Sequence, residues 1–393
     1  MMTGDFRHHK GGSSCEILSD PLRLCVFASL REPVLAKAPS RKETQRALAF
    51  PFCAFCAFLW LIRMDFTELI DLASERLGGT VLYANDEFFA PKENLLKASV
   101  PVFIEGKYTD LGKWMDGWES RRRRTPGFDW CIIRLGLAGV IRGVVVDTAH
   151  FKGNYPEQCS IEACAVDGLP TTEQLIDGSQ QWTEILPRAN LNGDSQNPFP
   201  TTSDERWTHL RFNIFPDGGV ARLQVYGEVA PQWNRLRQIG GDVDLAAVEN
   251  GGMVVTCSDM FFGHRHNLIM PGRAANMSDG WETKRRRGPG HDWTIIKLGT
   301  VGRIRRLEVD TSWFKGNFPE SCSLESCNAP DVPLETMQDP AFTWKPVLAR
   351  TKLQAHTRHF FDEVMETGTA SHVRFNIFPD GGVSRLRVYG TLE

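Results

Sequence analysis

The chain has 393 residues and an ordinary globular composition, with 41% hydrophobic residues, 24% charged residues and a formal net charge of −3. These values exclude a largely disordered chain and give no basic footprint for coating nucleic acid. Ten cysteines fall at scattered spacings, unlike the dense pattern of a small secreted protein. We therefore expect reduced thiols and a cytoplasmic protein. The C-terminal Thr-Leu-Glu is no peroxisomal address.

Residues 1–63 differ from the rest of the chain. They include a run of sixteen uncharged residues, 47–62, which lies between Arg46 and Arg63 and contains Pro51. A helix that spans a bilayer needs about 20 apolar residues, and a proline weakens a helix. We expect a leader that is not part of the fold, and a membrane anchor is the alternative.

Segment 65–79 carries the signals of a short helix. Asp65 can cap its start and Gly79 can end it. Between them, apolar residues recur at helical spacing, namely Leu69, Ile70, Leu72, Ala73 and Leu77. We expect the fold to begin at Met64, with one domain over 64–230, a linker over 231–248 and a second domain over 249–393.

A charged block at 116–130, Asp-Gly-Trp-Glu-Ser-Arg-Arg-Arg-Arg-Thr-Pro-Gly-Phe-Asp-Trp, returns in closely similar form at 279–293. From 116 to 164, 31 of 49 positions are identical to the residue 163 places later. Upstream, Asp86 aligns with Asp259 at an offset of 173, so the second copy is ten residues shorter in one loop (173 − 163 = 10). Each copy is about 150 residues long, the size of a single domain, so the chain is a tandem duplication of two domains.

This repeated block combines carboxylates and cations on what should be an exposed loop. Four carboxylates are candidates for a general base or a metal ligand: Asp116, Glu119, Asp279 and Glu282. The arginines at 121–124 are candidates for holding an anion, and the alternative is that they pair with carboxylates to fix the loop. The second block has His291 where the first has Phe128, so it is the better supplied with titratable groups.

Short strands are predicted between the motifs, at 80–83, 130–135, 141–147 and 159–164. Segment 209–215 alternates, with Leu210, Phe212 and Ile214 on one face and polar residues on the other. Pro-Asp-Gly-Gly at 216–219 then predicts a hairpin with 220–226, on which Arg222 points outward. Many short strands without long helices indicate an all-β sandwich or jelly roll.

The polar face of strand 209–215 is the second candidate site. It carries His209, Arg211 and Asn213, and the second copy has His372, Arg374 and Asn376 in the same places. Arginine offers a planar fork for a carboxylate, asparagine both donates and accepts, and histidine can carry a proton near neutral pH. The alternative is an outer sheet face that is merely solvated.

Metal-binding patterns are weak. Cys159 and Cys164 recur as Cys322 and Cys327, but a separation of five places two sulfurs on opposite faces of a strand, which favours structural cysteines. His264-Arg-His266 has no histidine counterpart in the first copy. We expect no metal site and no cofactor, while a divalent metal is not excluded.

Three repeated blocks carry a resemblance to a known family. They are the Asp-Gly-Trp-Glu block, Phe-Lys-Gly-Asn-[Tyr/Phe]-Pro at 151–156 and 314–319, and Arg-Phe-Asn-Ile-Phe-Pro-Asp-Gly-Gly at 211–219 and 374–382. Over residues 65–393 the chain resembles the allantoicases. The resemblance implies two tandem galactose-binding-like jelly rolls and a hydrolase of purine breakdown that cleaves allantoate to ureidoglycolate and urea. The alternative is a non-catalytic jelly-roll binding protein.

The substrate that the resemblance implies is a small molecule with one carboxylate and two ureido groups. We expect no nucleic acid or membrane partner. A homo-oligomer is possible. The resulting candidates for acid and base catalysis are Asp116, Glu119, His209, Asp279, Glu282, His291 and His372. The candidates for binding substrate are Arg211, Asn213, Arg222, Arg374, Asn376 and Arg385. Arg211 or Arg374 is expected to hold the carboxylate.

Overall fold

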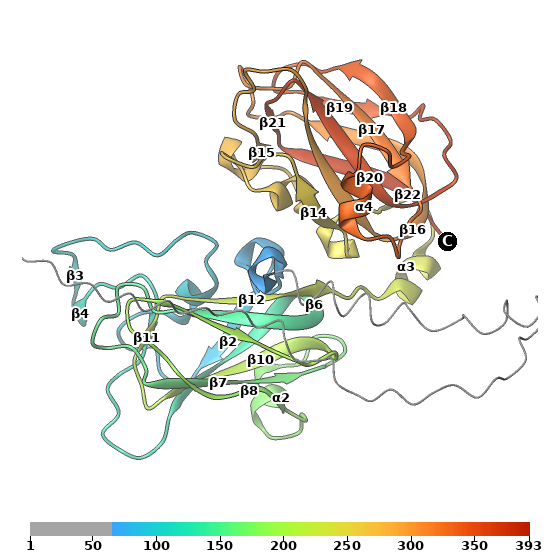
Figure 1. The fold of residues 1–393 in the computed structure, drawn as a ribbon. Coiled ribbons are helices and arrows are strands. Elements are labelled where there is room, and N and C mark those ends of the chain that lie inside the picture. The colour runs from blue at the N-terminus through green and yellow to red at the C-terminus, as the bar shows by residue number, and fades with distance from the viewer. Residues whose placement is uncertain (1–64) are drawn as a thin grey trace, which may run out of the picture. The chain divides into compact units, whose positions relative to one another are not determined.

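The computed structural model describes residues 65–393, so the leader expected at 1–63 and its apolar run lie outside the described residues. Nearly all regular structure in 65–393 is β, arranged as two sandwiches that follow one another along the chain (Figure 1). No helix within residues 65–393 is long and apolar enough to cross a bilayer. The predicted all-β fold of two tandem jelly rolls is confirmed.

Eight principal strands build the first sandwich. They are β1 (Ile70–Asp71), β2 (Thr80–Ala84), β6 (Asp129–Asp147), β7 (Gln158–Cys164), β8 (Thr183–Asn190), β9 (Gln196–Pro200), β10 (Arg206–Phe215) and β12 (Arg222–Val229). The short strands β3 (Tyr108–Thr109) and β4 (Gly112–Lys113) form a separate ribbon, and β5 (Trp118–Glu119) pairs with β11 (Gly219–Val220). A helical turn, α2 (Thr172–Ile176), precedes β8.

Strand β6 belongs to both layers of this sandwich. Its first half lies between β2 and β10, and its second half lies between β12 and β9. The two short strands predicted at 130–135 and 141–147 are therefore one strand of 19 residues. The hairpin predicted between 209–215 and 220–226 is wrong, because β10 and β12 each pair with β6 and not with each other.

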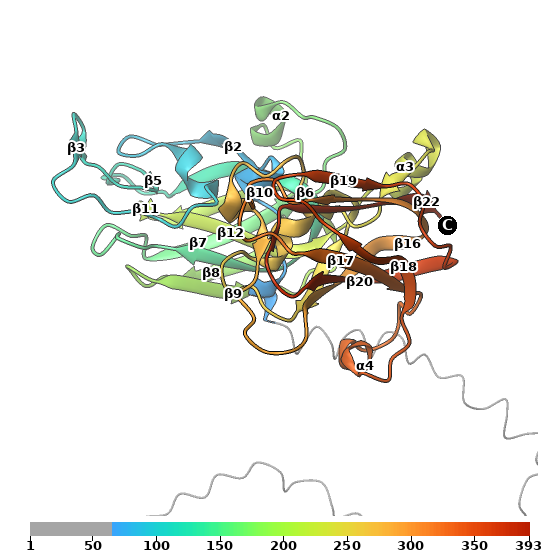
Figure 2. The same ribbon diagram turned by 90° about the horizontal axis from the view of Figure 1, so that it is seen from above.

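The second sandwich repeats this plan. Its strands are β13 (Val243–Asp244), β14 (Met253–Cys257), β16 (Asp292–Asp310), β17 (Ser321–Cys327), β18 (Lys345–Lys352), β19 (Arg358–Phe361), β20 (Thr369–Phe378) and β22 (Arg385–Leu392). The pair β15 (Trp281–Glu282) and β21 (Gly382–Val383) matches β5 and β11, and α4 (Leu334–Gln338) matches α2. Between the sandwiches runs α3 (Trp233–Ile239), labelled with most of these elements in Figures 1 and 2. Strand β13 pairs with β22, so the second sandwich includes residues from the predicted linker.

The helix predicted at 65–79 is wrong. The segment holds two single 3-10 turns, η1 (Phe66–Glu68) and η2 (Glu75–Leu77), with β1 between them. Asp65 does cap its turn by accepting from the N–H of Thr67, and Gly78 ends η2 at a φ of 90°. The backbone between the two turns forms strand hydrogen bonds with β12 and does not continue as a helix. This pairing buries the apolar side chains of the segment in the sandwich.

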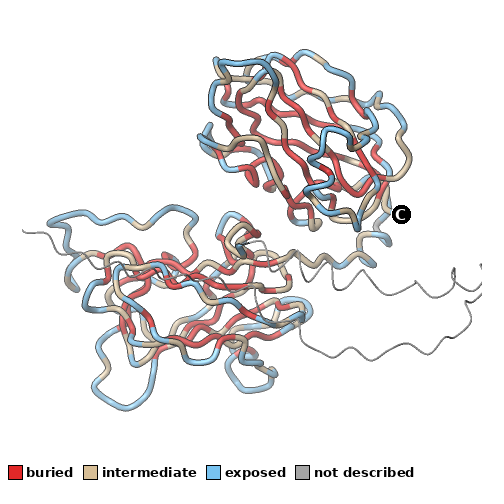
Figure 3. Tube along the Cα trace, viewed as in Figure 1, coloured by how far each residue is buried: buried red, intermediate tan, exposed pale blue. Residues whose placement is uncertain are grey.

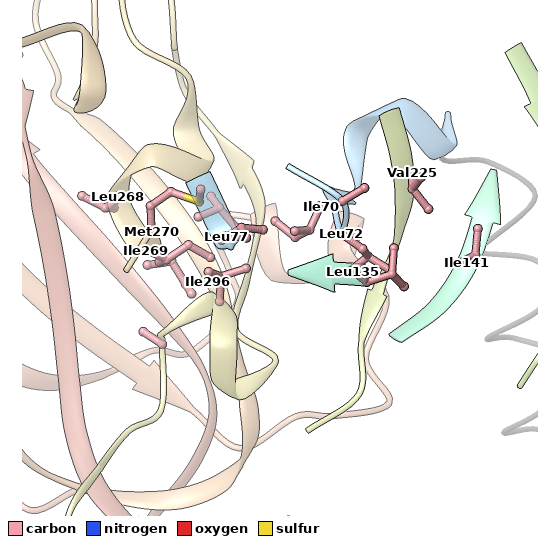
Figure 4. Packing of buried hydrophobic residues seen from close by; sticks show 14 of the residues in the cluster. Ile70, Leu72, Leu77, Leu135, Ile141, Val225, Leu268, Ile269, Met270 and Ile296 are labelled. Atoms are coloured by element: carbon pink, nitrogen blue, oxygen red, sulfur yellow. The ribbon is translucent and has the colours of Figure 1, made fainter. Parts of the chain in front are cut away.

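The core lies between the layers of each sandwich, where buried residues follow the strands (Figure 3). Trp118 and Phe212 are fully buried in the first sandwich, and Trp281 and Phe375 are their counterparts in the second. Figure 4 shows part of this packing, with Ile70, Leu72 and Leu135 from the first sandwich. Burial of the tryptophans fixes the short strands β5 and β15, on which Glu119 and Glu282 lie.

Candidate active site

Glu119 is held rigidly at the end of the first sandwich. Its backbone N–H donates to the carbonyl of Ala90 at 3.1 Å, and its carbonyl accepts from Phe89 at 3.1 Å. The adjacent Trp118 is fully buried, and its indole N–H donates to the carbonyl of Asp86 at 2.8 Å. A buried aromatic with a satisfied polar end is a firm anchor for the residue beside it.

Three repeated sequence blocks meet around this residue. The N–H of Gly219, in the Pro-Asp-Gly-Gly turn, donates to the carbonyl of Asn154 at 2.7 Å. A Cβ at Gly219 would lie 2.0 Å from the ring of Phe151, and one at Gly117 would lie 2.8 Å from the same ring. The glycines of two blocks thus make room for the phenylalanine of the third.

A pocket of about 270 Å³ opens beside Glu119. Its lining includes three basic side chains, Lys113, His150 and Lys152, together with Asn154. The Glu119 side chain is nearly buried, and the Asn154 amide donates to its Oε1 at 2.7 Å. Burial raises the pKa of Glu119, and the Asn154 hydrogen bond opposes that shift. The pocket therefore combines a carboxyl group of raised pKa with two lysine side chains of opposite charge.

His150 is held at this pocket by an unusual backbone conformation. Its φ is 70°, a left-handed value that is uncommon for residues other than glycine. Its N–H donates to Asp194 Oδ1 at 2.7 Å, and its Nε2 lies 3.3 Å from the carbonyl oxygen of Pro101. Asp194 also lies 3.7 Å from the Lys152 ammonium, so one carboxylate positions two pocket residues.

Asp116 does not face this pocket as a free carboxylate. It forms a buried ion pair with Arg222, with Oδ2 and Nη2 2.8 Å apart, and Arg222 also donates to the carbonyl of Ser99 at 2.9 Å. Burial alone would raise the pKa of Asp116, but the hydrogen bonds from Arg222 and from the Val102 N–H, together with the charges of Arg222 and Lys97, hold that pKa below its usual range. Arg222 is 3% exposed, so its predicted outward orientation is wrong. Asp279 and Arg385 form the equivalent pair at 3.0 Å.

The two strand histidines are buried instead of solvated. His209 and His372 are 2% and 5% exposed, so for these two side chains the alternative of a merely solvated sheet face is wrong. The pKa of each is lowered to about 4, first by burial and then by a nearby cation, Arg134 or Lys297. Both imidazoles are therefore neutral near pH 7.

Arg211 and Asn213 are joined through a carboxylate that the sequence analysis did not single out. Glu162 accepts from Nε and Nη2 of Arg211, both at 2.6 Å, and from the Asn213 amide at 3.1 Å. This two-pronged ion pair occupies the guanidinium edge that a substrate carboxylate would use.

The second sandwich has a looser version of this cluster. Arg374 Nε lies 3.9 Å from Glu325 and lacks a hydrogen-bond partner among the described residues. The Asn376 amide donates to Glu325 at 3.0 Å, and its carbonyl oxygen lies 3.2 Å from His291 Nε2. His291, Arg374 and Asn376 are thus brought together, as the sequence analysis grouped them.

Two arginines of the repeated block fix their own loop. Arg121 pairs with Asp86 at 2.7 Å, and Arg123 pairs with Asp129 at 2.6 Å. The N–H of Arg123 also donates to Asp217 at 2.9 Å, which ties the block to the Pro-Asp-Gly-Gly turn. This is the structural role that the sequence analysis kept as the alternative for 121–124.

Comparison with known proteins agrees with these repeated blocks. A family model described as the allantoicase repeat matches residues 70–230 and 243–393. The chain is 49% identical to an allantoicase from Dictyostelium discoideum, over 82% of this chain and 87% of that protein. The chain belongs to the allantoicase family. A probable allantoicase from Burkholderia mallei is 48% identical, over 84% of this chain and 96% of that protein.

A solved allantoicase also shares the fold. The crystal structure of allantoicase from Saccharomyces cerevisiae is 35% identical with a TM-score of 0.70, and the match covers 86% of this chain and 98% of that one. The agreement extends over both allantoicase repeats, so the duplicated jelly roll is a property of the family fold.

The second allantoicase repeat surrounds its own carboxylate differently. Glu282 accepts a hydrogen bond from Asn317, as Glu119 does from Asn154. Trp313 replaces His150, and the Asn317 amide also lies 3.5 Å from the Met277 sulfur. The glutamate, the asparagine and the lysine at 152 or 315 are common to both repeats, while His150 is not.

The sequence analysis missed the cationic half of this site. Lys152 and Asn154 lie in the Phe-Lys-Gly-Asn-Tyr-Pro block, which served only to identify the family, and no chemistry was assigned to them. The signal was available, because both residues recur in register as Lys315 and Asn317. Lys113 gave no such signal, since it lies in the segment by which the first repeat is longer.

Cysteines and histidines of the weak metal patterns have ordinary surroundings. Cys159 and Cys322 are fully buried free thiols, and burial raises the pKa of each to about 12. The His266 ring Nε2 lies 2.9 Å from the carbonyl oxygen of Glu68. Across 65–393, no three His, Cys, Asp or Glu side chains gather as a metal ion would require.

Proposed function

We propose that this chain hydrolyses allantoate to ureidoglycolate and urea, and that the reaction takes place in the Glu119 pocket. Membership of the allantoicase family supports the substrate and the reaction. The observation that carries the location is the pairing of a nearly buried carboxyl group of raised pKa with three basic side chains in one pocket.

The substrate carboxylate is the group that the basic side chains bind. Allantoate carries one carboxylate and two ureido groups on a single carbon, so its net charge is negative at neutral pH. Lys113 and Lys152 line the pocket and supply opposite charge. Their ammonium groups hold the carboxylate at one side, which leaves the ureido groups for the hydrogen-bonding side chains at the other.

Glu119 is the proton-transfer group. One of its oxygens accepts from Asn154, so the carboxyl group has a fixed orientation while its other oxygen exchanges protons. The carboxylate takes a proton from water as the water oxygen bonds to the central carbon. The bond from that carbon to one ureido nitrogen breaks, and the same carboxyl group returns the proton to that nitrogen as urea leaves. A raised pKa suits a group that both takes and returns a proton near neutral pH.

The cluster of His291, Arg374 and Asn376 is the alternative place for the same reaction. Arg374 is held less closely by its carboxylate than Arg211 is, at 3.9 Å instead of 2.6 Å. A guanidinium group that is not fully occupied can still bind a substrate carboxylate. Loss of activity in Arg374→Ala, with Lys152→Ala unaffected, would favour this alternative.

We place the enzyme in the cytoplasm, as a monomer or a homo-oligomer. The cytoplasmic assignment is supported by free cysteines throughout the described sandwiches. A sedimentation profile of the purified chain decides the assembly state.

The direct test of function is urea release from allantoate by the full chain, with and without a chelator. The proposal expects urea and ureidoglycolate in equal amounts. No urea under any condition, from a protein that is folded by circular dichroism, would refute the proposed reaction. Loss of urea release only after chelation, with recovery on adding a divalent metal, would assign a metal to the site.

A further inference from the structure

A second cavity, beside the first sandwich, lies away from the Glu119 pocket. It has a volume of about 610 Å³ and is lined by β10, the loop that follows β7, the bend of β6 and α3. No residue that lines it also lines the Glu119 pocket. A cavity of this volume is within the usual range for small-molecule sites.

Three arginines line this cavity, and the carboxylates lie at its rim. Arg134 and Arg206 are half-buried, while Arg235 on α3 is exposed. The acidic residues of the lining, Asp167 and Glu249, are both exposed. Two of the three cations are therefore less exposed than the carboxylates, and a ligand with a negative group would be drawn toward Arg134 and Arg206.

A buried histidine nitrogen of the lining lacks a partner. His209 lines the cavity and is 2% exposed, and its Nε2 makes no hydrogen bond within the described part of the chain. An unsatisfied buried polar atom costs about 1–3 kcal/mol unless a ligand or water satisfies it. This atom is a second and independent sign that something binds here.

The neighbouring hydroxyl group determines what His209 offers. Thr208 Oγ1 accepts from the N–H of Val166 at 2.9 Å, donates to the carbonyl of Cys164 at 3.2 Å, and lies 2.8 Å from His209 Nδ1. A hydroxyl has one proton, so it accepts from Nδ1–H in this arrangement. Nε2 is then the bare acceptor of a neutral ring, which agrees with the pKa of His209 being lowered to about 4 by burial and by Arg134.

The second sandwich keeps the histidine, has Lys297 in place of Arg134, and lacks Arg206. Ser371 Oγ there lies 2.9 Å from His372 Nδ1 and accepts from the N–H of Ala329, so the local arrangement is repeated. Thr369 stands where the first sandwich has Arg206. The histidine arrangement and one cation beside it, Arg134 or Lys297, are thus common to both repeats, whereas Arg206 is specific to the first.

We infer that this cavity is a second ligand site, distinct from the Glu119 pocket, for a small carboxylate that also carries an N–H donor. The carboxylate binds the guanidinium groups of Arg134 and Arg235, and the N–H donates to His209 Nε2. This inference does not depend on the proposed reaction, because it uses none of the residues placed at Glu119.

Calorimetric titration of the full chain with hydantoate tests the inference, since hydantoate has a carboxylate and a ureido group but no second ureido group to lose. We expect Arg235→Gln to weaken binding by about tenfold, the effect of losing one charge-assisted hydrogen bond. Arg237→Gln is the matched control, because Arg237 lies on the same helix outside the lining. Lys152→Ala separates any binding at the Glu119 pocket from binding at this site.

The nitrogen resonance of His209 Nε2 gives the second readout. Hydantoate is expected to shift it, whereas acetate and phosphate, which lack an N–H donor, shift it much less. Equal shifts with phosphate would show an adventitious anion only and overturn the inference. Hydantoate binding that Lys152→Ala removes and Arg235→Gln leaves intact would also overturn it, and would leave the proposed reaction in place.

Discussion

The surroundings of Glu119 and Glu282 show what the duplication preserved and what it did not. Each glutamate lies on a two-residue strand beside a fully buried tryptophan and accepts from an asparagine. Around Glu119 the lining includes His150 and Lys113, whereas Trp313 and Met277 lie near Glu282 and Asn317. The scaffold that holds a carboxylate was kept twice, and Lys152 has its counterpart in Lys315, but Lys113 and His150 have no counterpart in the second copy.

The largest effect expected from this difference is on turnover. Glu119→Gln removes the proton-transfer group and keeps the shape, so kcat should fall by about 10²–10⁴-fold. Glu282→Gln should change kcat by less than about twofold, because no step of the proposed reaction is assigned to Glu282. Steady-state urea release from both variants measures the contrast. Equal losses in the two would mean that both repeats catalyse.

The next effect concerns stability. Arg222→Met removes the buried partner of Asp116 and leaves the half-buried Lys97, 3.5 Å away, as the remaining cation, so the free energy of unfolding should fall by about 3–5 kcal/mol. Asp279 is more exposed than Asp116, with side chains 18% and 6% accessible, so Arg385→Met should cost less. Guanidinium unfolding followed by tryptophan fluorescence measures both. A larger loss for Arg385→Met would reverse the assigned order.

A smaller effect is expected on substrate binding. Lys152→Ala removes one cation from the pocket, and KM for allantoate should rise about tenfold with kcat largely kept. Lys315→Ala is the matched control in the second repeat and should leave KM unchanged. If Arg374→Ala raised KM and Lys152→Ala did not, the substrate carboxylate would lie on the strand cluster.

The smallest effect is a shift in pH dependence. Burial raises the pKa of Glu119, and the Asn154 hydrogen bond favours its ionised form. Removing that bond in Asn154→Ala raises the pKa further, so the acidic limb of kcat/KM should move to higher pH by roughly half a unit to one unit. Asn317→Ala should not move the limb. A shift to lower pH would contradict the role given to Glu119.

The local pattern of the sequence predicted the strands but not all of their connections. Period-two alternation located β10, and the second copy gave β20 at the same offset. Segments 130–135 and 141–147 were predicted as separate strands, whereas both lie within the single strand β6, where the chain passes between layers. Segment 65–79 had helical spacing, but pairing with β12 buried its apolar side chains better than a helix of its own.

The site was only partly visible because its residues meet through long-range contacts. Glu119 was identified from its repeated block. Asn154 and Lys152 come from a loop about 35 residues later, which the backbone contact between Gly219 and Asn154 brings alongside. Alternation also placed Arg222 on an outward face, where the loop at Ser99 and Asp116 in fact covers it. Sequence periodicity describes a strand and not the loops that cover it.

Where allantoate binds is the most direct test of the account. A crystal structure of the Glu119→Gln variant soaked with allantoate should show the substrate in the first repeat, with its carboxylate beside Lys152 and a ureido nitrogen beside the amide that replaces the Glu119 carboxyl group. Allantoate found only at Glu282, or against Arg374 and His291, would contradict the assignment of the reaction to the Glu119 pocket.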